Sequence, residues 1–222
     1  RSGGQWSVVD PHPRIDCRRP LVACHRTCRN RYSGWAARPA LAHRYCAARE
    51  GWEEAGRLSV RISMTDRLAI EANGVRLDEQ RFPGRQGRIL FAYLAVQHGR
   101  SVPRDELAEL LWGGDLPATW EKALRVLATK LRALLEECGI DGSSMLRSAF
   151  GCYQLTLPVD AWIDVDAAVT ALERGEAALA ARDLEEARTQ ASSAAEVARR
   201  VFLPGEDGRW VEDQRRNLRD VL

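Results

Sequence analysis

The sequence predicts an α+β winged helix-turn-helix domain followed by an all-α, tetratricopeptide-like helical domain. Three observations predict this fold class. Residues 58–157 open with short stretches in which apolar and polar residues alternate, as in half-buried strands. Stretches with helical periodicity follow, and then a second pair of short strands, which is the element order of a winged helix. From Trp162 onward the chain is rich in alanine and helical in pattern.

Two opening strands are predicted over 68–71 and 75–77, joined by Asn73-Gly74, and an earlier strand over 58–62 precedes them. Asn-Gly between alternating stretches is a strong signal for a two-residue hairpin turn. The domain is therefore expected to begin with a small antiparallel sheet.

Three helices are predicted next. The first carries Ile89, Leu90, Tyr93 and Leu94 on one face and stops at Gly99. The second starts after Pro103 and ends at 112–113, and the third runs from about Thr119 to about Cys138, before Gly139. Two strands, over 145–147 and 153–157, then form the predicted wing around 148–151.

The C-terminal segment, 158–222, is predicted to be helical over 165–181 and 184–200. Pro204-Gly205 interrupts this pattern, and a further helix is expected from about Trp210. A helix pair with small residues at its contact is similar to a tetratricopeptide hairpin, although one pair does not define a repeat array. Four tryptophans fall at predicted element ends, and we expect them to pack domains together: Trp112, Trp120, Trp162 and Trp210.

Charge is distributed unevenly along the 222 residues, whose formal net charge is +2. Residues 1–57 carry a net +6, 58–157 a net +1 and 158–222 a net −5. Such asymmetry predicts segments with different roles. The near-neutral total does not exclude nucleic-acid binding, because binding depends on where the positive charge lies. The 45% of hydrophobic residues excludes wholesale disorder, and no apolar run is long enough for a membrane span.

Residues 1–57 show no sustained periodicity and scatter prolines among arginines, and the first methionine is Met64. We expect this segment to be a disordered arm or an over-extended start. It holds a cluster whose spacing matches no standard zinc site, so no metal is expected there: Cys24, His25, Cys28, His43 and Cys46. The segment also has no secretory signal, which predicts a cytoplasmic protein.

The third predicted helix has two opposite faces. Leucines 124, 127, 131 and 134 share one face, and the other face carries Lys122, Arg125, Thr129 and Arg132. The basic face is either a solvated surface or, given its place on the third helix of a winged-helix pattern, the face that enters the DNA major groove. Arg and Lys donate hydrogen bonds to guanine O6 and N7, and Thr contacts bases or phosphates.

Other basic residues are candidates for supporting contacts. Arg85 and Arg88 flank the start of the first helix, where free backbone N–H groups also attract phosphate. Arg147 lies at the wing and could reach the minor groove. Lys130 lies between the two faces of the third helix and is a candidate phosphate contact. A plain surface arginine is an equally good interpretation of Arg85, Arg88 and Arg147.

Several segments together resemble one protein family. Phe82–Arg88, Arg104–Gly113 and Leu124–Leu135 resemble the DNA-binding domain of SARP-type transcriptional activators, the last being similar to its recognition helix. Ala161–Asp166 and Phe202–Val211 resemble their bacterial transcriptional activation domain. The resemblance covers about 58–222 and does not include 1–57.

This resemblance implies an OmpR-like winged helix that binds promoter direct repeats, followed by a helical domain. It further implies a regulator that recruits RNA polymerase holoenzyme and pairs as a homodimer on double-stranded DNA, in the cytoplasm with the nucleoid. The family's wing often reads Gly-Gly-Tyr-Arg-Leu, whereas this chain has Gly-Cys-Tyr-Gln-Leu over 151–155, which removes a basic residue at Gln154. Members usually continue with more helices, so the chain is expected to be truncated or a minimal member.

Two other function classes compete with a transcriptional regulator. A Cys–His hydrolase would need Cys138 or Cys152 beside a base such as His98, but no histidine is near either cysteine in sequence. There is no P-loop or dinucleotide fingerprint, so neither an enzyme nor a cofactor is expected. An adaptor that captures a protein through its C-terminal helices remains the alternative. These residues do not decide between an activator and a repressor.

Overall fold

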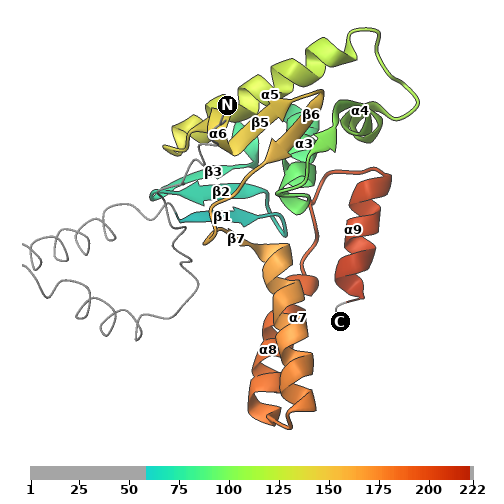
Figure 1. Cartoon of the computed structure of the whole chain (residues 1–222). Helices are drawn as coiled ribbons and strands as arrows, with labels where there is room; N and C mark the ends of the chain where they lie inside the picture. The colour runs from blue at the N-terminus through green and yellow to red at the C-terminus, as the bar shows by residue number, and fades with distance from the viewer. Residues whose placement is uncertain (1–58, 221–222) are drawn as a thin grey trace, which may run out of the picture. The chain divides into compact units, whose positions relative to one another are not determined.

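The computed structural model describes residues 59–220, all of which lie in the second of the chain's two units. The expectations for residues 1–57, including the Cys24–Cys46 cluster, concern residues outside this described part. The unit is a mixed α and β structure in which two small sheets are combined with helices (Figure 1). Within residues 59–220 no helix is both long and apolar enough to cross a membrane.

The first sheet contains the predicted antiparallel strands β1 (Val60–Ser63), β2 (Ala69–Ala72) and β3 (Val75–Asp78). Asn73 and Gly74 connect β2 to β3 and have φ angles of 52° and 76°. Both values are left-handed, as a type I′ hairpin turn requires. The predicted opening hairpin is therefore confirmed.

A fourth strand, β7 (Trp162–Ile163), completes this sheet by pairing parallel to β1. The expectation that the chain is helical from Trp162 onward was wrong for these two residues. Ile163 is buried at the sheet, and the guanidinium of Arg61 lies 4.2 Å from the Trp162 ring centroid. These tertiary contacts favour an extended backbone at Trp162 and Ile163, and the helix begins at Asp164.

Three helices follow β3 in the sequence: α3 (Gly84–Val96), α4 (Arg104–Trp112) and α5 (Trp120–Glu137). A short 3₁₀ turn, η2 (Glu79–Arg81), precedes them. Gly113 and Gly139 follow α4 and α5 with φ angles of 56° and 71°. A left-handed residue after a helix satisfies its last carbonyl groups, which explains why glycine stands there. The predicted helices are confirmed to within a few residues.

The second sheet is built from β4 (Val102–Pro103), β5 (Leu146–Ala149) and β6 (Cys152–Leu155), in the order β4-β6-β5. The β5–β6 hairpin was predicted, whereas β4 was not. A short helix, α6 (Gly142–Met145), was also missed. The Asp141 side chain accepts hydrogen bonds from the amides of Ser143 and Ser144 and caps this helix.

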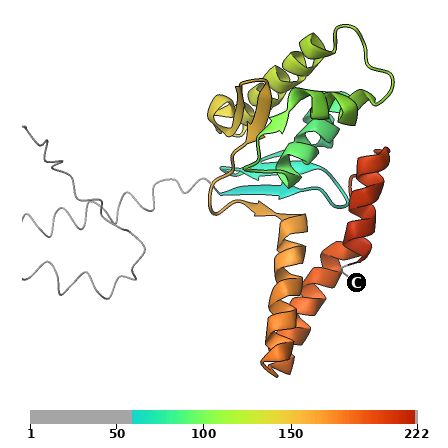
Figure 2. The same cartoon turned by 45° about the vertical axis from the view of Figure 1, so that its right-hand side comes forward.

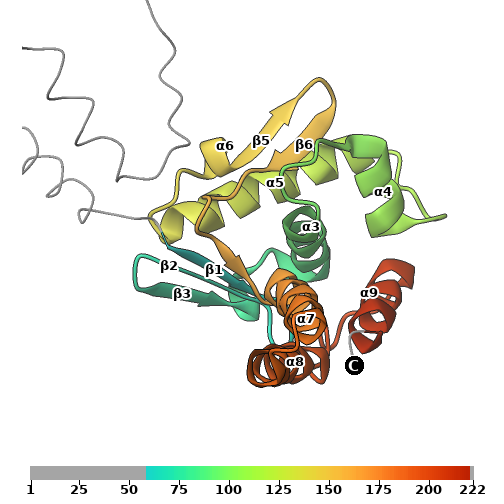
Figure 3. The same cartoon turned by 60° about the horizontal axis from the view of Figure 1, so that its bottom comes forward.

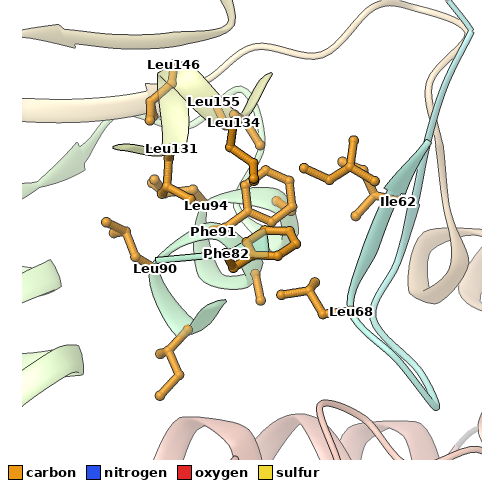
Figure 4. Close-up of a cluster of buried hydrophobic side chains, with 14 of the residues drawn as sticks. Ile62, Leu68, Phe82, Leu90, Phe91, Leu94, Leu131, Leu134, Leu146 and Leu155 are labelled. Carbon is orange, nitrogen blue, oxygen red and sulfur yellow. The ribbon is translucent and has the colours of Figure 1, made fainter. Parts of the chain in front are cut away.

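The core lies between the first sheet and the helices (Figure 4). Phe82 and Phe91 pack with a ring-centroid distance of 5.3 Å near its centre. The predicted leucine face of α5 is buried in this core, as shown by the labelled Leu131 and Leu134. Burial of these side chains fixes which face of α5 remains exposed to solvent.

The C-terminal segment forms α7 (Asp164–Ala180), α8 (Leu184–Ala198) and α9 (Arg209–Arg219). Helices α7 and α8 form a pair that extends away from the first sheet (Figures 1 and 2). Small residues are buried along the pair, as predicted: Ala168, Ala171, Gly175, Ala194 and Ala198. Helix α9 returns to α3 and α4 (Figure 3), where Trp210 packs edge-on against Tyr93 and Phe202.

A buried carboxylate joins the C-terminal segment to the first sheet. Asp164 is only 1% exposed, and its Oδ2 accepts hydrogen bonds from three donors at 2.8 Å: the amide of Met64 and both the amide and the hydroxyl of Thr65. Its Oδ1 accepts from the Val165 amide at 2.9 Å. The end of β1 is thereby tied to the first turn of α7, where a negative charge also suits the helix dipole.

We expect Asp164→Ala to lower the free energy of unfolding by about 3 kcal/mol, because it leaves buried amides of Met64 and Thr65 without an acceptor. Urea denaturation of the full chain measures this loss. Asp160→Ala, which removes an exposed carboxylate nearby, is the matched control and should change stability little. Equal stability of the two variants would contradict the role given to Asp164.

Candidate nucleic-acid interface

The exposed face of α5 carries the residues singled out in the sequence. Lys122, Arg125, Thr129 and Lys130 are all exposed to solvent. The Arg125 side chain is 71% exposed and lies 3.9 Å from the Glu121 carboxylate one turn earlier. The Thr129 hydroxyl donates to the Arg125 carbonyl at 2.9 Å. These four predicted residues are therefore all accessible, and Lys130 lies to the side of the other three on α5.

Arg132, on the same helix, forms hydrogen bonds with the β5–β6 hairpin. Its Nε donates to the Leu146 carbonyl at 2.9 Å, and its Nη2 donates to the Ser148 hydroxyl at 3.0 Å. The side chain is half-buried between α5 and β5. Its guanidinium holds the β5–β6 hairpin against α5, and the expectation that Arg132 faces the major groove with Lys122 and Arg125 stays a prediction.

The β5–β6 hairpin stands beside α5 (Figure 1). Arg147 is exposed on β5, and its Nε donates to the Ser144 carbonyl at 3.0 Å, which leaves the other guanidinium nitrogens facing solvent. Phe150 and Gly151 form the hairpin tip. On β6 the Gln154 amide donates to the Gly99 carbonyl, so this side chain anchors the hairpin to the loop after α3.

A groove of 320 Å³ separates the start of α5 from the hairpin. Its lining includes Arg104, Trp120, Arg125 and Phe150. Arg104 lies 3.4 Å from the Glu121 carboxylate, and its guanidinium lies over the Trp120 ring at 6.0 Å from the centroid. Sequence analysis missed Arg104 and Phe150 as site residues.

Arg104 and Phe150 are not signalled by the sequence because only the tertiary structure brings them together. Pairing of β4 with β6 brings the two residues together, and the Arg104 amide donates to the Gly151 carbonyl at 2.9 Å. Residues 104 and 151 are far apart in sequence, so no local pattern signals this contact. An arginine directly after Pro103 is also ordinary in the first turn of a helix, so its position gives no signal of a binding role.

Three arginines lie near Tyr153 on β6, and the Glu121 carboxylate pairs with two of them, Arg104 and Arg125. Burial raises the pKa of the Tyr153 hydroxyl, and the guanidiniums of Arg132, Arg125 and Arg104 act in the opposite direction. Three arginines therefore lie within electrostatic reach of one point beneath the groove. Such convergence attracts a polyanion even though the chain as a whole is almost neutral.

Arg85 and Arg88 lie away from this group, near the start of α3. Arg88 pairs with Glu206, a carboxylate that is 5% exposed, and Arg85 pairs with Asp207 and lies 3.4 Å from Glu206. These ion pairs hold the loop before α9 against α3. Both arginines thus bind carboxylates of the same chain, and the expected phosphate contacts stay a prediction.

Two acidic residues of α4, Glu106 and Glu109, line the groove between α4 and α9, whereas the exposed Asp105 lies 3.9 Å from Arg104. Glu106 accepts hydrogen bonds from Arg100 and from the Tyr93 hydroxyl, and the bond from Arg100 lowers the pKa of its carboxyl group. Glu109 lines the same groove near Trp210. The Glu106 and Glu109 carboxylates therefore lie on the α9 side of α4, where they repel a polyanion at α5 less strongly.

The cysteines and His98 do not form a nucleophilic pair in the described residues. Cys138 is buried, and burial raises the pKa of its thiol, which disfavours the reactive thiolate. The half-buried Cys152 thiol contacts the Phe150 carbonyl at 3.8 Å. The His98 ring lies 3.0 Å from the Ala95 carbonyl and 3.7 Å from Asp166. Residues 59–220 contain no acidic, histidine and cysteine cluster suited to a metal ion.

Comparison with solved structures shows a fold similar to that of EmbR from Mycobacterium tuberculosis, solved in complex with a low-affinity phosphopeptide. The TM-score is 0.59 and the sequences are 24% identical, over 74% of this chain and 40% of the EmbR chain. At this identity the likeness shows a shared fold, and the chain spans less than half of EmbR. No protein-family model matches the chain, and no curated protein sequence matches it.

We expect Arg132→Ala to loosen the β5–β6 hairpin. Backbone amides of β5 and β6 should exchange with deuterium about tenfold faster, because hydrogen bonds from a charged donor contribute roughly 1.5 kcal/mol. Lys130→Ala, on the exposed side of the same helix, is the control and should leave exchange unchanged. Unaltered exchange in Arg132→Ala would show that Arg132 does not hold the hairpin.

Proposed function

We propose that the chain is a sequence-specific DNA-binding transcriptional regulator with an OmpR-like winged helix, in which α5 is the recognition helix and the β5–β6 hairpin is the wing. The observation that carries this proposal is the exposed polar face of α5, with Lys122, Arg125 and Thr129, beside a hairpin and a groove flanked by arginines. An exposed helix of this kind fits the major groove, and the neighbouring wing fits the minor groove.

Each residue has a proposed role. Lys122 and Arg125 donate to base edges, most favourably to guanine, and Thr129 contacts a base or phosphate. Lys130 contacts phosphate from the side of α5, and Arg104 does so from the start of α4. Arg147, on the wing, contacts the minor groove. Arg132 acts indirectly, because it holds the wing in position.

The fuller proposal is that the chain is a SARP-type activator. The segments that resemble this family lie within α3–α5 and around α7 and α9, and the likeness to the EmbR fold supports the same arrangement. On this basis the tetratricopeptide-like C-terminal helices contact RNA polymerase holoenzyme, and two copies bind promoter direct repeats side by side. The protein would work in the cytoplasm at the nucleoid, by binding and without catalysis or a cofactor.

A protein-binding adaptor is the second candidate, and one observation favours it. The α7–α8 pair carries a groove of 360 Å³ with an almost wholly apolar surface, lined by residues that include Leu172, Leu179 and Leu184. Leu179 and Leu184 are each more than half exposed. Exposed apolar side chains gathered in one place are typical of surfaces that bind other proteins.

Binding to DNA separates the two candidates. We expect the full chain to enrich a defined sequence from a random duplex library, with an affinity that falls steeply as salt rises, because bound cations are released from phosphates. On the enriched duplex, Arg125→Ala should cost about 1–3 kcal/mol of binding free energy if Arg125 reads a base. Fluorescence anisotropy at several salt concentrations measures both effects.

Arg188→Ala is the matched control for this experiment, because Arg188 is an exposed arginine on α8. It should bind the enriched duplex like the unaltered chain. Unchanged affinity of Arg125→Ala would contradict the assignment of α5 as the recognition helix. Absence of duplex binding even at low salt would favour the adaptor.

A further inference from the structure

Phe150, at the tip of the β5–β6 hairpin, is fully exposed. Its relative accessibility is 104%, and it is absent from the hydrophobic core cluster. A phenyl ring in water is unfavourable because its apolar surface orders the surrounding solvent. The ring therefore contributes little to the fold within the described residues and is accessible to a partner.

The backbone at Phe150 also disfavours this residue. Phe150 and Gly151 have φ angles of 51° and 74°, so both central residues of the turn are left-handed. Asparagine, aspartate and glycine are the residues that such a turn prefers, whereas a bulky side chain in this region is an outlier. Conformations of this kind are concentrated at ligand-binding sites.

The hairpin holds the ring on a firm support. Its strands pair with each other and with β4, and the Gly151 carbonyl accepts a hydrogen bond from the Arg104 amide at 2.9 Å. Arg132 fixes β5 from the side of α5. A ring supported in this way can contact a partner without displacement of the hairpin.

The charges around the ring indicate which partner it meets. Phe150 lines the same groove as Arg104, Arg125 and Glu121, where the two arginines outnumber the one carboxylate, and Arg147 is exposed on the adjoining strand. An apolar ring among guanidiniums complements a surface on which stacked bases lie between two rows of phosphates. The surface is therefore better matched to duplex DNA than to an apolar protein partner.

We infer that the Phe150 ring is an apolar wedge that enters the DNA minor groove, partly unstacks one base step and bends the duplex. This inference rests on the proposed DNA-binding function and extends it to the class of duplex that is preferred. Pyrimidine–purine steps such as TA and CA/TG unstack and kink most easily. A preferred site therefore carries such a step at a fixed distance from the bases read by α5.

The test compares the full-length chain with Phe150→Asn and Phe150→Leu. Asn suits the left-handed turn and removes the ring, whereas Leu keeps an apolar wedge. Val159→Ala is the control, because Val159 is an equally exposed apolar residue outside the hairpin. Each protein is used to enrich duplexes from a random-sequence library. The enriched duplex is then labelled with 2-aminopurine at the pyrimidine–purine step, where unstacking raises fluorescence.

The unaltered chain, Phe150→Leu and Val159→Ala are expected to enrich the flexible step and to raise the fluorescence. Phe150→Asn should bind that duplex about tenfold more weakly, the scale of one lost aromatic–base contact, and lose the preference and the signal. Equal affinity, preference and fluorescence for Phe150→Asn and the unaltered chain would overturn the wedge and leave DNA binding intact. Failure of the unaltered chain to bind any duplex would overturn both proposals.

Discussion

The hydrogen bonds that the Asp164 carboxylate accepts are the interaction on which the arrangement of the described residues depends. By accepting three hydrogen bonds from Met64 and Thr65, it fixes the point where the first sheet passes into α7. After α8 the chain comes back to this end of β1, where the Leu203 amide donates to the Met64 carbonyl at 2.9 Å. Helix α9 is then directed toward α3 and α4. Removing a charge from water is costly, and this arrangement offsets the cost by giving the carboxylate several donors.

Much of the fold could be predicted because its signals are local. Asn73-Gly74 specifies a hairpin turn from its own backbone preferences, and the spacing of leucines specifies the buried face of α5. The strands β4 and β7 have two residues each, so they carry almost no periodic signal and form only because a partner strand is present. The same limit applies to side chains. Arg88 meets Glu206 across 118 positions of sequence, and no pattern near Arg88 indicates that partner.

The candidate site shows a similar division between local and tertiary information. A helical wheel gives the direction of Lys122, Arg125 and Thr129, and these side chains are exposed as predicted. It cannot reveal that β5 lies beside Arg132 and binds its guanidinium. The net charge is also a poor guide, because ion pairs within the chain engage some arginines and leave others accessible. Arg85 and Arg88 stabilise the loop before α9, whereas Arg125 and Arg147 remain exposed.

The two-residue strand β7 has a consequence for how the chain can be divided. It covers the edge of β1, and it belongs to the segment that follows the predicted boundary at 157–158. A fragment that ended at that boundary would expose the backbone N–H and C=O groups of β1. Uncovered strand edges recruit strands from other molecules and promote aggregation. The shortest well-behaved fragment that contains both sheets should therefore extend beyond Ile163, so the boundary predicted from the sequence and the folding boundary of this protein are different.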